Sequence, residues 1–176
     1  MFSPAFAPDR GAAWRGEIVK TDKMTPNFVL KPESVAIAHA GSKAEILAAM
    51  ADIFARAWNL DAAIVLEQLE EREKLGSTGF GRGIAIPHAR YAGVPRPVAA
   101  LLKLEKPVDF DAADGLPVDL VFGLLSPENC GATHLHALAA ISRMARDERM
   151  HEALSDADDA EALYALLTNV TDRDAA

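Results

Sequence analysis

Apolar and polar residues follow one another in the patterns of both strands and helices. The stretch SVAIAHA at 34–40 alternates as a short strand does. After it, apolar residues recur at helical spacing from Ile46 to Trp58. Ser42 and Glu45 stand three residues apart just before this run, which is the spacing of a capping box. The pattern therefore predicts a strand followed by a capped helix.

A second helix is predicted directly after the first. Asp61 is a good N-cap, and the helical pattern runs to about Leu75. Gly76 then stands where a C′ glycine ends many helices. A glycine-rich segment follows and leads into GIAIPHA at 83–89, which we predict to be a strand.

Two longer apolar stretches complete the predicted sheet. PVAALLKLE at 97–105 and PVDLVFGLLSP at 117–127 both have the composition of strands. The second is almost entirely apolar, as a central strand buried on both faces would be.

Helices are predicted for the C-terminal part of the chain. Thr133 would cap a helix that runs to about Asp147. Asp158 and Glu161 have capping-box spacing and would open a final helix to about Thr168. The alternation of predicted strands and helices favours a single layered α/β/α domain with a mixed β-sheet flanked by helices.

The domain boundaries follow from where these patterns begin and end. Residues 1–23 show no steady periodicity and contain two prolines, and we expect a mobile N-terminal extension over residues 1–27. One domain would then occupy residues 28–170, and residues 171–176 would form a C-terminal tail.

Composition and charge narrow the range of functions. The net charge of −8 disfavours nucleic acid and acidic membrane surfaces as partners, since both attract basic proteins. One cysteine, Cys130, allows neither an intrachain disulfide nor a cysteine-rich zinc site. We see no apolar run near the ~18 residues of a membrane span and no signal peptide, so the expected location is the cytoplasm.

The segment GSTGFGRG at 76–83 precedes a candidate nucleophile, His88. It lacks the Lys-Ser/Thr of a Walker A loop, and it enters a strand where a dinucleotide fingerprint would open a helix. Its glycines permit unusual backbone angles and close approach, and Pro87 stiffens the chain next to the imidazole. His88 is therefore either an accessible reactive histidine or a hydrogen-bonded histidine beside an ordinary turn.

Three more residues are candidates for chemistry. Arg72 continues the buried stripe of the second helix, where its guanidinium would extend to the surface, pair with a carboxylate or face an anion. His134 heads the apolar stripe of a later helix, whereas His136 is about 200° away around the axis. A zinc site from His88, His134 and His136 is possible, but HExxH and H-x₃-H spacings are absent.

REKLGSTGFGRGIAIPHAR followed by THLHAL strongly resembles the EIIA proteins of the bacterial phosphoenolpyruvate phosphotransferase system (PTS), of the mannitol/fructose type. FDAADGLPVDLVFGLL resembles the stretch between the two histidine motifs of that family. The resemblance spans roughly residues 29 to 170 and is greatest to the nitrogen-regulatory branch.

The resemblance implies a phosphorelay without a cofactor or metal. His88 matches the histidine that accepts a phosphoryl group from an HPr-like phosphocarrier (NPr). His134 matches the second histidine, which stabilises the phosphoryl group, and Arg72 matches an arginine that supplies positive charge. The protein would regulate targets by its phosphorylation state, and targets in the family include potassium-transport and sensor-kinase proteins.

Other functions remain open from the sequence. A sugar-importing EIIA of the fructose or mannitol type would pass its phosphoryl group to an EIIB domain. The chain could also be a non-catalytic binding module or a metal-dependent hydrolase. Phe80 and Arg82 depart from the usual family loop, which more often has an aliphatic and a small polar residue there, and these differences could alter the choice of carrier.

Overall fold

The computed structural model describes residues 23–24 and 27–174 of the 176. Most of the predicted N-terminal extension therefore lies outside the described residues, as do the last two residues of the predicted tail. The strands are β1 (Lys23–Met24), β2 (Val29–Ala38), β3 (Gly79–Gly81), β4 (Ile84–Ala85), β5 (His88–Arg90), β6 (Val98–Val108) and β7 (Val118–Ser126). The helices are α1 (Lys43–Trp58), α2 (Ala62–Lys74), α3 (Gly131–Arg146), α4 (Glu148–Asp156) and α5 (Ala160–Asp174).

The seven strands form one mixed sheet, as predicted. Its order is β1-β2-β6-β7-β4-β3, and β5 pairs with β7 in line with β4. β2 runs parallel to β6, and β4 and β5 run parallel to β7, whereas β6 and β7 are antiparallel. β7 thus has neighbours on both edges, which confirms the central position predicted from its apolar composition.

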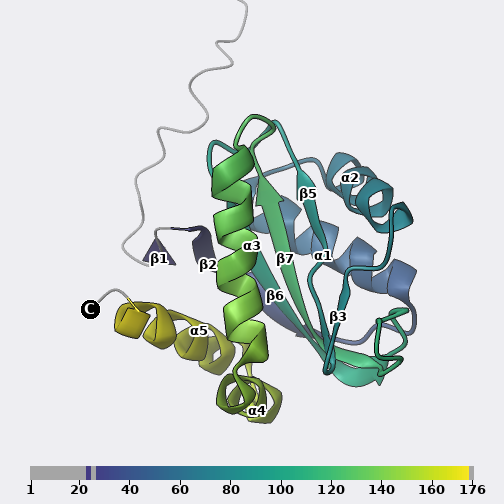
Figure 1. The fold of residues 1–176 in the computed structure, drawn as a ribbon, viewed down its shortest axis with the longest axis vertical. Coiled ribbons are helices and arrows are strands. Elements are labelled where there is room, and N and C mark those ends of the chain that lie inside the picture. The colour runs from purple at the N-terminus through teal and green to yellow at the C-terminus, as the bar shows by residue number, and fades with distance from the viewer. Residues whose placement is uncertain (1–22, 25–26, 175–176) are drawn as a thin grey trace, which may run out of the picture.

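Helices cover both faces of the sheet, which confirms the α/β/α arrangement (Figure 1). On one face, α1 and α2 bury Phe54, Trp58 and Leu69 in one apolar cluster. On the other face, α3, α4 and α5 contribute Ile141 and other apolar side chains to a second cluster. Removal of these side chains from water supplies the main driving force for folding, at about 25 cal/mol per Å².

The predicted starts of the first two helices are confirmed. The Ser42 hydroxyl accepts the N–H of Glu45 at 3.2 Å, and the Glu45 carboxylate accepts the N–H of Gly41 at 2.7 Å. Asp61 caps α2 by accepting the N–H groups of its second and third helical residues. Gly76, just past the end of α2, has φ +143°, which suits the predicted glycine.

Two of the predicted strands differ clearly from the structure. The strand predicted at 34–40 begins earlier, at Val29, because the preceding residues also pair with β6. The strand predicted at 83–89 is divided into β4 and β5. Pro87 has no N–H, and the N–H of Ile86 is bonded to the Thr78 carbonyl at 2.9 Å rather than to β7. The register against β7 is the same on both sides of this break.

Two predicted caps are wrong. α3 begins at Gly131, so Thr133 lies inside its first turn and is exposed, and Cys130 occupies the N-cap position without a side-chain bond. At α5 the carboxylate that accepts a backbone N–H, that of Ala162 at 2.8 Å, belongs to Asp159 rather than to Asp158. α5 also continues to Asp174, past its predicted end.

Within the part of the chain that the structure describes, no helix has the length and apolar character needed to cross a bilayer.

Candidate functional site

His88 is the first residue of β5 and is half-buried. Its Nδ1 lies 2.8 Å from the carbonyl oxygen of Ile86, two residues earlier. A carbonyl can only accept, so Nδ1 must carry the proton of the neutral ring. Nε2 is therefore unprotonated and carries the ring's lone pair, which is the form of imidazole that can act as a nucleophile.

Arg72 brings a positive charge to that nitrogen. Its Nε–H donates to His88 Nε2 at 3.1 Å, and its Nη1 donates to the carbonyl of Gly76 at 3.0 Å. The neighbouring carboxylates bond elsewhere, Glu71 to a lysine and Glu73 to Lys43 and to the start of the glycine segment. Of the roles left open by the sequence, Arg72 thus has the geometry for an anion at His88 rather than for a carboxylate pair.

His134 lies beside His88, on α3. The two ring centroids are 5.6 Å apart, and the ring planes are inclined by 49°. His134 is only 8% exposed, and its Nδ1 lies 2.8 Å from the hydroxyl oxygen of Ser126. His136 is exposed on another side of the helix, as its predicted angular separation requires.

Both histidines are kept neutral by their surroundings. Burial lowers the pKa of His88, and the positive charges of Arg72 and Arg90 lower it further against the opposing bond to Ile86. Burial, Arg90 and His88 together lower the pKa of His134 to about 4. Each ring is therefore uncharged at neutral pH, with one protonated and one bare nitrogen.

Two residues of the site were missed by the sequence analysis. Arg90 stands two positions after His88 in β5, and its Nη1 donates to the carbonyls of Pro127 and Cys130 at 3.2 and 3.1 Å. Spacing of two along a strand places side chains on one face, so this arginine could have been found. Ser126 could not, because its place beside His134 depends on the β5–β7 pairing.

The glycine segment forms a tight hairpin between β3 and β4. Gly81, Arg82 and Gly83 have φ values of +96°, +59° and +81°, a run that only a glycine-rich sequence adopts at low cost. Asp114 accepts the N–H of Arg82 at 2.7 Å, and the Arg82 guanidinium pairs with Glu148 of α4. The glycines therefore have a local structural reason, besides any contact with a partner.

The residues described by the structure contain no group of three or more His, Cys, Asp or Glu side chains arranged to hold a metal ion. His136 in particular is exposed, away from the buried ring of His134. The chemistry available at the site is thus that of two neutral imidazoles and two guanidinium groups.

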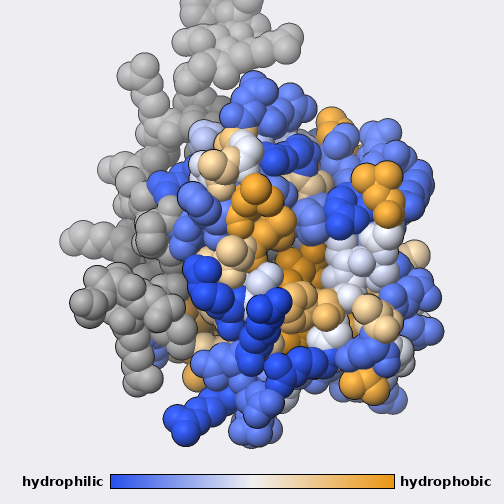
Figure 2. Space-filling model, in the orientation of Figure 1, coloured by the Kyte–Doolittle hydropathy of each residue, from blue (hydrophilic) through white to orange (hydrophobic). Residues whose placement is uncertain are grey.

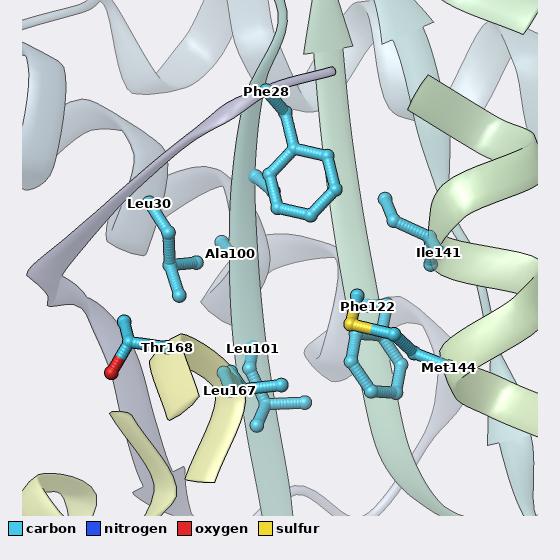
Figure 3. Close-up of a pocket in the computed structure, with 10 residues that line it drawn as sticks. Phe28, Leu30, Ala100, Leu101, Phe122, Ile141, Met144, Leu167 and Thr168 are labelled. Atoms are coloured by element: carbon cyan, nitrogen blue, oxygen red, sulfur yellow. The ribbon is translucent and has the colours of Figure 1, made fainter. Parts of the chain in front are cut away.

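A small cavity lies elsewhere, between the sheet, α3 and α5 (Figure 3). Its volume is about 10 Å³, room for one water molecule at most. Nine of its ten lining residues are apolar, among them Phe28, Leu101 and Ile141. It is a packing defect of the core and is separate from the two histidines.

The face that carries α3 has an apolar centre. Figure 2 shows hydrophobic atoms between α3 and the strands to its right, surrounded by hydrophilic ones. On these elements, Leu135 is 64% exposed, and Phe80 and Leu138 are half-buried. An apolar centre with a polar rim is typical of surfaces that bind another protein.

Comparisons with known proteins agree with this description. The family model "Phosphoenolpyruvate-dependent sugar phosphotransferase system, EIIA 2" matches residues 28–170. A nitrogen regulatory protein of Pseudomonas aeruginosa is 48% identical over 131 residues, which are 74% of this chain and 85% of that protein.

Solved structures give the same result. The nitrogen regulatory protein IIA-Ntr of Neisseria meningitidis has a TM-score of 0.73 and 40% identity, over 79% of this chain and 96% of the other. The mannitol enzyme IIA of Escherichia coli has a TM-score of 0.65 and 21% identity over 77% and 96%, a likeness in fold alone.

Proposed function

Because the chain belongs to the phosphoenolpyruvate-dependent sugar phosphotransferase system EIIA 2 family, we propose that it is a cytoplasmic histidine phosphocarrier of the nitrogen-related branch. It would accept a phosphoryl group on His88 from an HPr-like carrier (NPr). Its phosphorylation state would then regulate target proteins, such as potassium-transport or sensor-kinase proteins.

One observation carries the proposal. His88 has a bare Nε2, fixed by the bond from Nδ1 to the Ile86 carbonyl, and the Arg72 guanidinium lies 3.1 Å from that same nitrogen. The site thus holds an unprotonated ring nitrogen with a guanidinium beside it. A phosphoryl acceptor needs both, because phosphoryl transfer depends mainly on positioning and on stabilisation of charge.

Transfer moves the phosphoryl group from the carrier's imidazole to that of His88. The Nε2 lone pair of His88 forms a bond to the phosphorus of the carrier's phosphohistidine. The carrier's N–P bond breaks, and its electron pair returns to the carrier's imidazole. His88 then carries a phosphoryl group on Nε2 and a proton on Nδ1, so its ring becomes positive, and the Ile86 carbonyl stabilises that charge.

Arg72 and His134 would serve the transferred group. As the new N–P bond forms, the Arg72 Nε–H loses its acceptor on His88 and turns to the phosphoryl oxygens. His134, with ring centroid 5.6 Å from that of His88, can donate to the same oxygens. Leu135, directly beside it, belongs to the apolar surface on which the carrier would dock.

The comparison with nitrogen regulatory proteins favours regulation over the alternative of sugar import. The relative from Pseudomonas aeruginosa, at 48% identity, carries that name, and so does the structure from Neisseria meningitidis. In both alternatives the acceptor is the same nitrogen of His88, so the first experiment concerns that nitrogen.

The test is intact-mass spectrometry at neutral to alkaline pH. The protein is incubated with phosphoenolpyruvate, Enzyme I and the HPr-like carrier of the same organism. We expect a gain of one acid-labile phosphoryl group that is absent in His88→Ala, whereas His134→Ala gains it more slowly. No gain with a demonstrably active carrier, or full labelling of a folded His88→Ala, would contradict the proposal.

A further inference from the structure

Ser126 ends β7 and is fully buried. Its hydroxyl oxygen lies 2.8 Å from Nδ1 of His134, and among the described residues this is its single side-chain hydrogen bond. A serine hydroxyl has one proton to donate, and a buried O–H without an acceptor costs free energy. Only one arrangement avoids that cost, in which Ser126 donates and Nδ1 of His134 accepts.

This arrangement fixes the position of the proton on His134. The pKa of about 4 keeps the ring neutral at pH 7, so it has a single N–H. Since Nδ1 accepts, the proton is on Nε2. His134 therefore presents a donor at Nε2, whereas His88 presents a bare nitrogen at Nε2 because its proton is held by the Ile86 carbonyl.

From this contrast we infer that Ser126 is a positioning residue that keeps His134 in the Nε2–H tautomer. The inference rests on the proposed function of His88 as the phosphoryl acceptor. In this tautomer, His134 donates to the phosphoryl group that arrives on His88. In the other tautomer its bare Nε2 would repel the phosphoryl oxygens and would itself be a second nucleophile in the same site.

The backbone around Ser126 is well placed for this role. Its carbonyl accepts the N–H of Tyr91 at 2.8 Å, and it pairs with Arg90 in the β5–β7 register. Arg90 in turn donates to the carbonyls of Pro127 and Cys130, on the segment that leads from β7 into α3. One strand therefore carries the acceptor His88 and also the arginine that secures the connection between Ser126 and the helix of His134.

The first test reads the tautomer directly and does not depend on phosphoryl transfer. Long-range ¹H–¹⁵N spectra of the histidine rings are recorded for the unphosphorylated wild type, Ser126→Ala and Ser126→Thr. We expect His134 to be protonated at Nε2 in the wild type and in Ser126→Thr, and to gain Nδ1–H character in Ser126→Ala. A wild-type His134 protonated at Nδ1 would overturn the inference.

The second test measures transfer from the phosphorylated carrier by rapid quench. Ser126→Ala should be slower by about ten-fold or more, because a donor to the transferring group is lost part of the time. Ser126→Thr should restore the rate, and Ser142→Ala, a half-buried serine of α3, is the matched control. A wild-type rate and tautomer in folded Ser126→Ala would refute the role of Ser126 and leave the function of His88 intact.

Failure of the proposed function can be told apart from failure of this inference. If the wild type accepts no phosphoryl group, the proposed function is wrong, whereas the tautomer of His134 is still measured. If Ser126→Ala does not fold, the wild-type spectrum and the transfer rate of Ser126→Thr test the inference instead. A proton on Nδ1 of His134 in the wild type would contradict it. A lost transfer rate in folded Ser126→Thr would contradict it as well.

Discussion

The strand β5 and the first turn of α3 each bring one imidazole to the site, and they control it by different means. On β5, a backbone carbonyl fixes the tautomer of His88. On α3, a side-chain hydroxyl lies against the ring of His134. A carbonyl has no proton to give, whereas a hydroxyl can donate or accept. The tautomer of His88 is therefore set by a backbone carbonyl, which a substitution of Ile86 leaves in place. The contact at His134 depends on a side chain that substitution of Ser126 removes.

Arg72 and Arg90 also differ in how they act on the two histidines. Arg72 contacts His88 directly and can follow the transferred group. Arg90 contacts the carbonyls of Pro127 and Cys130 instead, and acts on both histidines through its charge. One is thus placed for the chemistry and the other for the architecture around it.

Among the variants that keep His88, the largest expected effect concerns Arg72. Arg72→Ala should slow phosphoryl transfer by about 100-fold, the usual loss when one preorganised donor to a developing charge is removed. Rapid-quench transfer from the phosphorylated carrier measures the rate. Arg56→Ala, an exposed arginine of α1, is the control and should keep the wild-type rate. Equal rates in the two variants would mean that Arg72 only supports the fold.

The next effect concerns the pH dependence of stability. His134 has a pKa of about 4 in the folded protein and about 6.5 when unfolded, so only the unfolded chain takes up its proton between these values. The stability that His134 contributes is complete above pH 6.5 and is lost as the pH falls toward 4. Between pH 7 and pH 5, His134→Gln should therefore lose about 2 kcal/mol less than the wild type.

Urea unfolding at the two pH values measures this difference. His136→Gln, on the exposed side of the same helix, is the matched control and should lose as much stability as the wild type. An equal loss of stability in His134→Gln and the wild type would show that the buried ring does not contribute to the pH dependence of stability.

The smallest expected effects come from two glycine substitutions, one in the hairpin that leads to β5 and one at the start of α3. Gly83→Ala should destabilise the protein by about 1–2 kcal/mol, because Gly83 has φ +81° and an added Cβ would lie 3.0 Å from Asp119 Oδ1. Gly131→Ala should stay within about 0.5 kcal/mol of the wild type or stabilise, since beyond the adjoining residues and the helix's own backbone nothing lies within 4 Å of the added Cβ. Urea unfolding of the pair tests whether the hairpin alone requires its glycine.

The features that can be predicted from the sequence are those that depend on residues close together in the chain. The caps Ser42 and Asp61 are correct because each bonds to the backbone two or three residues away. The same reasoning predicts Thr133 as a cap, but α3 begins earlier, where Arg90 binds the carbonyl of Cys130. That contact joins residues 40 positions apart, so no local pattern indicates it.

The same distinction applies to the site. Helical spacing places Arg72 on the buried stripe of its helix, and the sequence itself shows that His88 follows Pro87. The distance of His88 from His134, and the bond from Ser126, depend on the pairing of β5 with β7 and on the packing of α3. The roles of the three site residues came from the family resemblance, and the structure adds the tautomers.

The central claim is that Nε2 of His88 is the acceptor atom. Heteronuclear NMR of the ¹⁵N-histidine protein, phosphorylated by its carrier, identifies the ring nitrogen that couples to phosphorus. The account predicts phosphorus on Nε2 and a proton retained on Nδ1 toward the Ile86 carbonyl. Phosphorus on Nδ1 of His88, or on either nitrogen of His134, would contradict it.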